Sequence, residues 1–212
     1  APGWRLPWPF DSGTPLIGNI QTSLFYPLGV LFYVLPSEQA YGYTVILHCA
    51  LASVFMYSFM RTAAVSKEGS LLSALIFTFS GFFMGHLYAG HLTFIQAYIW
   101  IPLVFRCLYL LVQTQRLFFA VAAGLVQGIQ LLGGFPQIAF YTILAGAAFL
   151  CFHAFLLLKM RCRGDALWMA VGLGIVWLVG GGLSAVQLAP TAEFAKLSTR
   201  GEGLNYAMAT YE

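Results

Sequence analysis

Six long apolar stretches limit what this chain of 212 residues can fold into. They cover residues 40–60, 70–88, 95–112, 117–133, 136–158 and 166–188. A helix needs about 20 mostly apolar residues to cross the hydrocarbon core of a bilayer. Only 8% of the residues are charged, against roughly 25% in a soluble domain, so the chain cannot cover a water-facing surface. The sequence therefore predicts an all-α, polytopic transmembrane helix bundle with about six spans.

Composition and charge exclude several other classes of protein. Hydrophobic residues make up 60% of the chain, whereas disordered chains have low hydrophobicity and high charge. The net charge of +3 is too small for the basic surface of a nucleic-acid-binding protein, so no nucleic-acid partner is expected. The four cysteines have no metal-ligand spacing. We assign no metal ligands and no certain cofactor, and a requirement for a divalent metal is left open.

The apolar pattern divides the chain into three parts. Residues 1–39 are expected to form an external loop, in which 24–36 lies at the membrane interface because it is too short and too rich in proline to cross. Residues 40–190 are expected to form the six-span bundle, in which Pro102 interrupts the third span. Residues 191–212 are expected to begin another external loop. We interpret the chain as a fragment of a larger membrane domain.

The distribution of Lys and Arg predicts the orientation. One set of connections carries Arg61, Lys67, Arg116, Lys159, Arg161 and Arg163. The other set carries only Arg5, Lys196 and Arg200. Because cytoplasmic loops are enriched in Lys and Arg, the first set is predicted to be cytoplasmic, and both ends of the chain are predicted to lie outside.

Polar side chains gather towards the predicted outer ends of the spans. They include His86, His91, Gln96, Gln127, Gln130, Gln137, Ser184, Gln187 and Glu193. For any single glutamine, a hydrogen bond between helices is the favoured interpretation. For the whole set, the distribution favours a polar recess that opens outward. No span contains Asp or Glu, which argues against ion-coupled transport.

Two local patterns each allow a structural and a functional interpretation. His86 and His91 are five residues apart and would not share a face of one helix; they either form hydrogen bonds at a helix–loop junction or act as a proton acceptor or phosphate contact. The GGFPQ sequence at 133–137 predicts a tight hairpin between two spans. Its N–H groups, at the start of a helix, are also suited to meet a phosphate.

Four segments carry a resemblance to a known family: GTPLIGNIQTSLFYPLGVLFYVLP (13–36), FSGFFMGHLYAGHLTFIQAYIWIPLVF (79–105), GGFPQIAFYTILAG (133–146) and GLSAVQLAPTAEFAKLSTRGEGLNY (182–206). In this order they resemble the YfhO-like bacterial membrane proteins, which belong with the GT-C-type glycosyltransferases. The resemblance implies an enzyme of the bacterial cytoplasmic membrane that takes a sugar from a polyprenyl-phosphate carrier. It implies transfer of that sugar, on the outer face, to an envelope glycan or teichoic-acid-like acceptor.

The resemblance also implies roles for individual residues. The catalytic carboxylate of such enzymes lies in the first external loop and is expected upstream of Ala1; Asp11 is the candidate present in this sequence. His86 and His91 complete the candidate catalytic residues. The candidate substrate-binding residues are Gln96, Gln137, Glu193, Lys196 and Arg200. Phe135 stands where the family often has histidine. A lipid or glycolipid flippase is the alternative function, and a membrane scaffold is a third.

Overall fold

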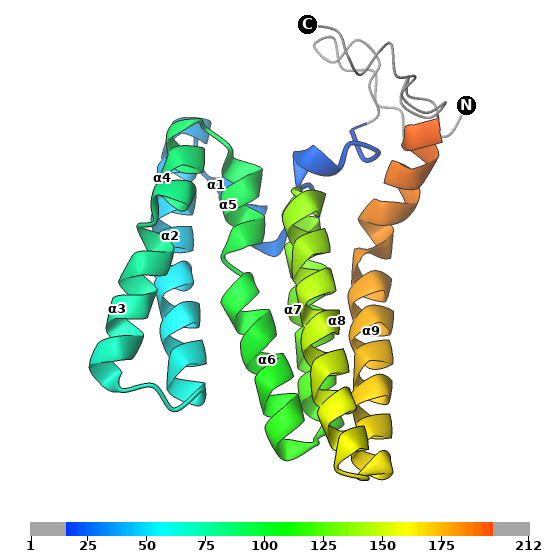
Figure 1. The fold of residues 1–212 in the computed structure, drawn as a ribbon. Helices are drawn as coiled ribbons and strands as arrows, with labels where there is room; N and C mark the ends of the chain where they lie inside the picture. The colour runs from blue at the N-terminus through cyan, green and yellow to red at the C-terminus, as the bar shows by residue number, and fades with distance from the viewer. Residues whose placement is uncertain (1–15, 197–212) are drawn as a thin grey trace, which may run out of the picture.

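The computed structural model describes residues 16–196, and all of the regular structure in that range is helical (Figure 1). Asp11 and Arg200 lie outside the described residues. The short leading elements are η1 (Ile20–Thr22), η2 (Pro27–Val30) and α1 (Leu31–Val34). The longer helices are α2 (Ser37–Thr62), α3 (Lys67–Thr78), α4 (Gly81–Tyr88), α5 (Leu92–Tyr98), α6 (Ile101–Thr114), α7 (Leu117–Leu132), α8 (Pro136–Lys159) and α9 (Arg163–Lys196).

The predicted all-α bundle is confirmed, with one span shorter than the rest. Within residues 16–196, five helical segments are long and apolar enough to cross a membrane: Ser37–Thr62, Lys67–Tyr88, Leu92–Thr114, Pro136–Lys159 and Arg163–Lys196. The remaining predicted span corresponds to α7, which has 16 residues. At about 1.5 Å per residue, α7 is roughly 24 Å long, which is somewhat less than the hydrocarbon thickness.

Two of the spanning segments are broken helices. The break between α5 and α6 was predicted from Pro102, which lies in the first turn of α6 and has no N–H to continue the preceding helix. The break between α3 and α4 was not predicted. There Ser80 is the N-cap of α4, and its Oγ accepts a hydrogen bond from the Phe83 N–H at 3.2 Å. A serine side chain competes with the helical backbone in this way.

The structure corrects two predicted boundaries. The helix α2 begins at Ser37 rather than at residue 40. The helix α9 continues to Lys196, so residues 191–196 are helical and do not begin a loop. Pro190 lies inside α9, where Thr191 Oγ1 donates to the Gln187 carbonyl at 2.8 Å. This side-chain bond helps to satisfy backbone groups around the proline.

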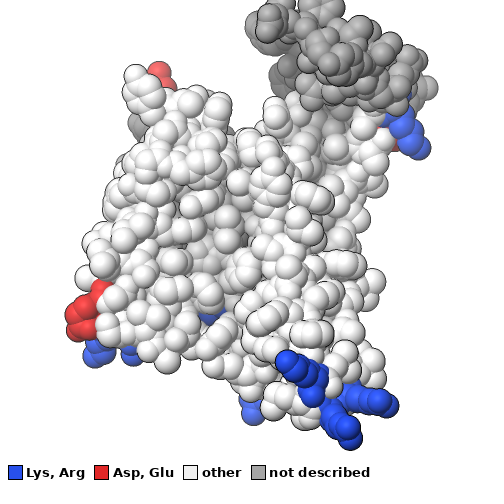
Figure 2. All heavy atoms as spheres, viewed as in Figure 1, with Lys and Arg blue, Asp and Glu red and all other residues white. Residues whose placement is uncertain are grey.

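Positive charge gathers at one end of the bundle. The α2–α3, α6–α7 and α8–α9 connections all lie at this end (Figure 1). Figure 2 shows Lys and Arg concentrated there, on an otherwise almost uncharged surface. Arg106 reaches the same end, where its Nε donates to Thr62 Oγ1 at 3.0 Å. The connections between the helices therefore alternate between the two ends of the bundle, as the sequence predicted.

The helices α7 and α9 pack with their backbones in direct contact. A Cβ atom added at Gly124 would lie 2.9 Å from the Val176 carbonyl oxygen, and one at Gly180 would lie 3.1 Å from the Gly124 carbonyl oxygen. A Cβ at Gly128 would meet Leu183 at 2.8 Å. Small residues let helices approach this closely in a membrane. The two helices form one closely packed pair beside α8.

Candidate functional site

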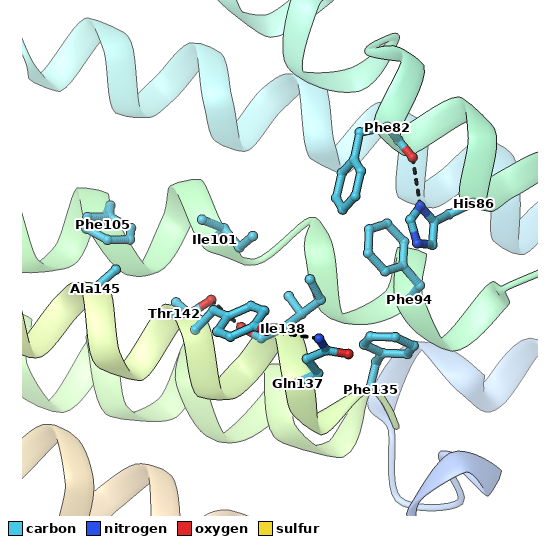
Figure 3. A pocket seen from close by; sticks show the side chains of 11 residues that line it. Phe82, His86, Phe94, Ile101, Phe105, Phe135, Gln137, Ile138, Thr142 and Ala145 are labelled. Carbon is cyan, nitrogen blue, oxygen red and sulfur yellow. Dashed lines mark hydrogen bonds between the residues drawn. The ribbon is translucent and has the colours of Figure 1, made fainter. Parts of the chain in front are cut away.

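A cavity of about 440 Å³ lies between α4, α5, α6 and the first half of α8 (Figure 3). It is lined by Phe82, His86, Phe94, Ile101, Phe105, Phe135, Gln137, Ile138, Tyr141, Thr142 and Ala145. Most of these side chains are apolar or aromatic. Its lining residues come from two segments, 82–105 and 135–145, that are 30 positions apart in the chain, so only the folded bundle creates it.

The lining of this cavity changes from polar to apolar along the bundle. His86 and Gln137 lie at the end nearest the α4–α5 and α7–α8 turns, and Phe105 and Ala145 lie at the other end (Figure 3). Gln137 and Ala145 are eight residues apart on α8, which corresponds to roughly 12 Å along the helix. The cavity can therefore hold a long apolar group that has a polar head at one end.

His86 is held in a defined orientation beside the polar end. Its Nδ1 lies 2.9 Å from the Phe82 carbonyl oxygen, and because a carbonyl can only accept, Nδ1 carries the proton. The imidazole stacks on the Phe94 ring with centroids 3.7 Å apart. In this tautomer Nε2 has a lone pair and no hydrogen-bond partner among residues 16–196. His86 can thus accept a proton from a hydroxyl group, or carry positive charge beside an anion once protonated.

The structure brings His91 next to His86, although the two would not share a face of one helix. The chain turns at Gly90, whose φ is +75°, and His91 then precedes α5 as its N-cap residue. The two imidazole centroids are 5.5 Å apart. Both rings border a shallow cavity of about 330 Å³ that shares Phe82 and His86 with the larger cavity. The two histidines therefore form one pair beside the polar end of the larger cavity.

The start of α8 faces the same cavity. Pro136 is the first residue of the helix, and the N-cap residue Phe135 makes no side-chain capping hydrogen bond. Gln137 Nε2 donates to the Tyr141 hydroxyl at 3.0 Å, which places an amide and a phenol together. The partial positive charge and free N–H groups of a helix start favour an anion.

The two glycines before α8 have a structural role. Gly134 has φ +83°, and a Cβ there would overlap Ser23 Oγ. Ser23 Oγ donates to the Gly133 carbonyl at 3.0 Å. A Cβ at Gly133 would lie 3.1 Å from the Ala97 nitrogen. The turn is thus the predicted tight hairpin, and it is packed against both α5 and the leading segment.

The buried glutamines of α7 connect helices and do not line the large cavity. Gln127 Nε2 donates to Gln130 Oε1 at 2.7 Å. Gln130 Nε2 donates in turn to the Ala97 carbonyl and to Thr142 Oγ1, each at 3.0 Å. For Gln130 the structure supports interhelical hydrogen bonding, as favoured for single glutamines, over the outward recess expected for the set, whereas the Gln127 bond stays within α7.

The remaining predicted site residues are not assembled at this cavity. Gln96 is buried on another face of α5 and borders a separate cavity. Glu193 and Lys196 are exposed on the last turns of α9, on the opposite side of the bundle from α4 (Figure 1). Among residues 16–196, no group of three or more His, Cys, Asp or Glu side chains is placed to hold a metal ion.

Sequence reasoning missed a buried hydrogen-bond network around Tyr26. The Tyr26 hydroxyl lies 2.8 Å from His48 Nε2, and Trp100 Nε1 donates to it at 3.1 Å. His48 Nδ1 lies 2.7 Å from the Thr44 carbonyl, so Nδ1 carries the proton and Nε2 accepts from Tyr26. Burial raises the pKa of Tyr26 above its ordinary value, so the hydroxyl keeps its proton, although the bond from Trp100 opposes the shift. No spacing rule connects residues so far apart in the chain.

Replacing this tyrosine with phenylalanine (Tyr26→Phe) is expected to lower the free energy of unfolding by about 1–3 kcal/mol, because Trp100 Nε1 and His48 Nε2 then stay buried without partners. The measurement is unfolding in mixed micelles. The control is Tyr57→Phe on α2, whose hydroxyl makes no hydrogen bond within residues 16–196, and which should change stability by less than about 0.5 kcal/mol. Equal stability of the two variants would contradict a stabilising role for the network.

A family model described as bacterial membrane protein YfhO matches residues 19–204, a range that includes every element of the cavity. Neither the curated proteins nor the solved structures contain a match to the chain.

Proposed function

The chain belongs to the YfhO family of bacterial membrane proteins, and from that premise we propose that it is a membrane glycosyltransferase. It moves a sugar from a polyprenyl-phosphate carrier to an envelope glycan or teichoic-acid-like acceptor. The observation that carries this proposal is the cavity between α4 and α8. Its apolar length suits an isoprenoid chain, and its polar end suits the phosphate that links the chain to the sugar.

The charge distribution gives the proposed orientation. Because Lys and Arg are enriched on the cytoplasmic side of membrane proteins, the end with the α2–α3 and α8–α9 connections faces the cytoplasm. His86, His91 and Gln137 then lie at the outer face of the cytoplasmic membrane. A carrier phosphate placed at their level lies at the depth of the lipid headgroups, with its tail among the helices.

The proposed reaction needs a base and a stabilised leaving group. A hydroxyl of the acceptor attacks the anomeric carbon, the bond from that carbon to the carrier phosphate breaks, and polyprenyl phosphate leaves with the bonding electron pair. Gln137 and the first N–H groups of α8 stabilise that phosphate. The acceptor proton passes to a base, for which Asp11 and the histidine pair are the candidates in this chain.

The cavity favours a transferase over a flippase. A flippase must carry a phosphate and sugar through the inner half of the membrane, which requires a polar path. The cavity instead ends among Phe105 and Ala145. Glu193 and Lys196 are left out of the proposed centre because they lie on the far side of the bundle (Figure 1).

Filling the apolar end of the cavity tests the proposal. Ala145→Phe places a ring where the isoprenoid chain is proposed to lie, and is expected to weaken binding of a long-chain polyprenyl phosphate about tenfold, equivalent to about 1.4 kcal/mol. Binding is measured by native mass spectrometry on the purified protein. The rate of sugar transfer from the loaded carrier should fall in parallel.

The matched control is Ala148→Phe, one turn further along α8 at an exposed position that does not line the cavity. It should bind the carrier as the wild type does. The proposal fails if the wild type binds no polyprenyl phosphate, or if the two variants bind it equally well.

A further inference from the structure

A second cavity, of about 290 Å³, lies between the leading segment 21–33 and α5. Six of its lining residues carry a hydroxyl or amide group: Gln21, Thr22, Ser23, Tyr33, Thr93 and Gln96. No Lys, Arg, Asp or Glu is among the described residues that line it. The cavity is therefore uncharged and more polar than the apolar cavity assigned to the carrier.

Three of its four hydroxyl groups already donate their protons to backbone carbonyls. Thr22 Oγ1 donates to the Asn19 carbonyl at 2.9 Å, and Ser23 Oγ donates to the Gly133 carbonyl at 3.0 Å. The Tyr33 hydroxyl donates to the Leu24 carbonyl at 3.3 Å. Each oxygen retains lone pairs. The Thr93 hydroxyl and the amide nitrogens of Gln21 and Gln96 have no hydrogen-bond partner within residues 16–196, so the cavity offers both acceptors and donors. It suits a ligand whose groups both donate and accept hydrogen bonds.

Gln96 adds a buried acceptor without a partner. Its side chain is 3% exposed, and its Oε1 has no hydrogen bond within the described part of the chain. A buried amide oxygen left unpaired costs about 1–3 kcal/mol. Gln96 borders the cavity, and rotation of its terminal amide exchanges the oxygen and nitrogen positions. In the rotated orientation the oxygen can accept a hydrogen bond from a donor bound in the cavity.

We propose that this cavity binds one neutral sugar ring, whose hydroxyl groups donate to Gln96 and to the oxygens of Thr22 and Ser23. Its volume is at the lower limit of small-molecule sites, which begin at about 300 Å³, so it suits a single ring. A phosphate group does not fit the lining, because it is anionic and no Lys or Arg is among the described residues that line the cavity.

The position of the cavity relates it to the carrier site. Gln96 lies about 160° around α5 from Phe94, which lines the carrier cavity. The ring and the carrier therefore contact different faces of one short helix. The sugar site itself is argued from the cavity. Only the source of the sugar ring, either the donor sugar or a sugar of the acceptor, rests on the proposed function.

Gln96→Met tests the sugar site because it removes the amide and keeps the length of the side chain. Since Oε1 has no partner in the chain, the substitution should leave the free energy of unfolding unchanged or raise it. The probe is a panel of neutral methyl pyranosides, measured by saturation-transfer NMR on the protein in nanodiscs. At least one should bind the wild type, and it should bind Gln96→Met about tenfold more weakly.

The matched control is Gln113→Met, at an exposed position near the other end of α6, which should bind the pyranoside as the wild type does. The proposal is overturned if no pyranoside binds the wild type, or if the two variants bind equally well.

This experiment separates failure of the sugar site from failure of the proposed function. If the protein binds a pyranoside in a Gln96-dependent way but binds no polyprenyl phosphate, the sugar site stands and the transferase proposal fails. If it binds polyprenyl phosphate but no pyranoside, the transferase proposal stands and the sugar site fails. A transfer assay identifies the source of the ring. If Gln96→Met raises KM for the acceptor, the ring belongs to the acceptor; if it raises KM for the donor, the ring is the donor sugar.

Discussion

Gly124→Leu is expected to lower the free energy of unfolding by about 3 kcal/mol, at the upper end of the usual cost of overpacking. A Cβ at this position would lie 2.8 Å from Val179 Cβ and 2.9 Å from the Val176 carbonyl oxygen. Neither atom can rotate away, because both are fixed to the backbone of α9. The larger side chain therefore has to push α7 away from α9, along the contact that also includes Gly128 and Gly180.

The matched control is Gly182→Leu, on the exposed face of α9, where an added Cβ meets no atom within 4 Å. It should change stability by less than about 0.5 kcal/mol. Unfolding in mixed micelles, followed by circular dichroism, measures both variants. Equal stability of Gly124→Leu and Gly182→Leu would show that the two helices are free to separate at little cost.

The fold was predictable where a local property decides the structure. Apolar runs determine which segments enter the membrane, and Pro102 breaks a helix through its missing N–H. The break at Ser80 was not predicted because a serine in an apolar run is common and only its capping bond to Phe83 reveals the effect. The sixth span was predicted from the apolar run that ends at residue 188, whereas α9 continues past Pro190 to Lys196.

Two polar residues of the candidate cavity were selected from the sequence, whereas its geometry was not predictable. His86 and Gln137 were selected from their position at the outer ends of spans, and they line one cavity. His86 and His91 meet because the chain turns at Gly90, which helical spacing cannot show. Gln96 was grouped with them, yet one short helix separates it from their cavity. Which face of α5 meets which neighbour depends on packing across the whole bundle.

His86→Phe is expected to lower the rate of sugar transfer about 100-fold, within the range attributed to a single proton-transfer or charge-stabilising group. Phenylalanine keeps an aromatic ring that can stack on Phe94, which the imidazole contacts at 3.7 Å between centroids. It removes Nε2, the atom proposed to meet the reacting groups. The loss should appear mainly in kcat, because an interaction made only in the transition state lowers kcat and leaves KM nearly unchanged.

His153→Phe provides the matched control, since His153 lies on α8 beside Phe149 and is not among the residues that line the carrier cavity. It should transfer sugar at the wild-type rate. Both variants should bind polyprenyl phosphate and unfold as the wild type does, so that a change in rate reports chemistry and not folding. If His86→Phe raises KM for the donor and leaves kcat unchanged, His86 binds the carrier in the ground state only. If it changes neither constant, the catalytic centre lies elsewhere and the base has to be sought at Asp11.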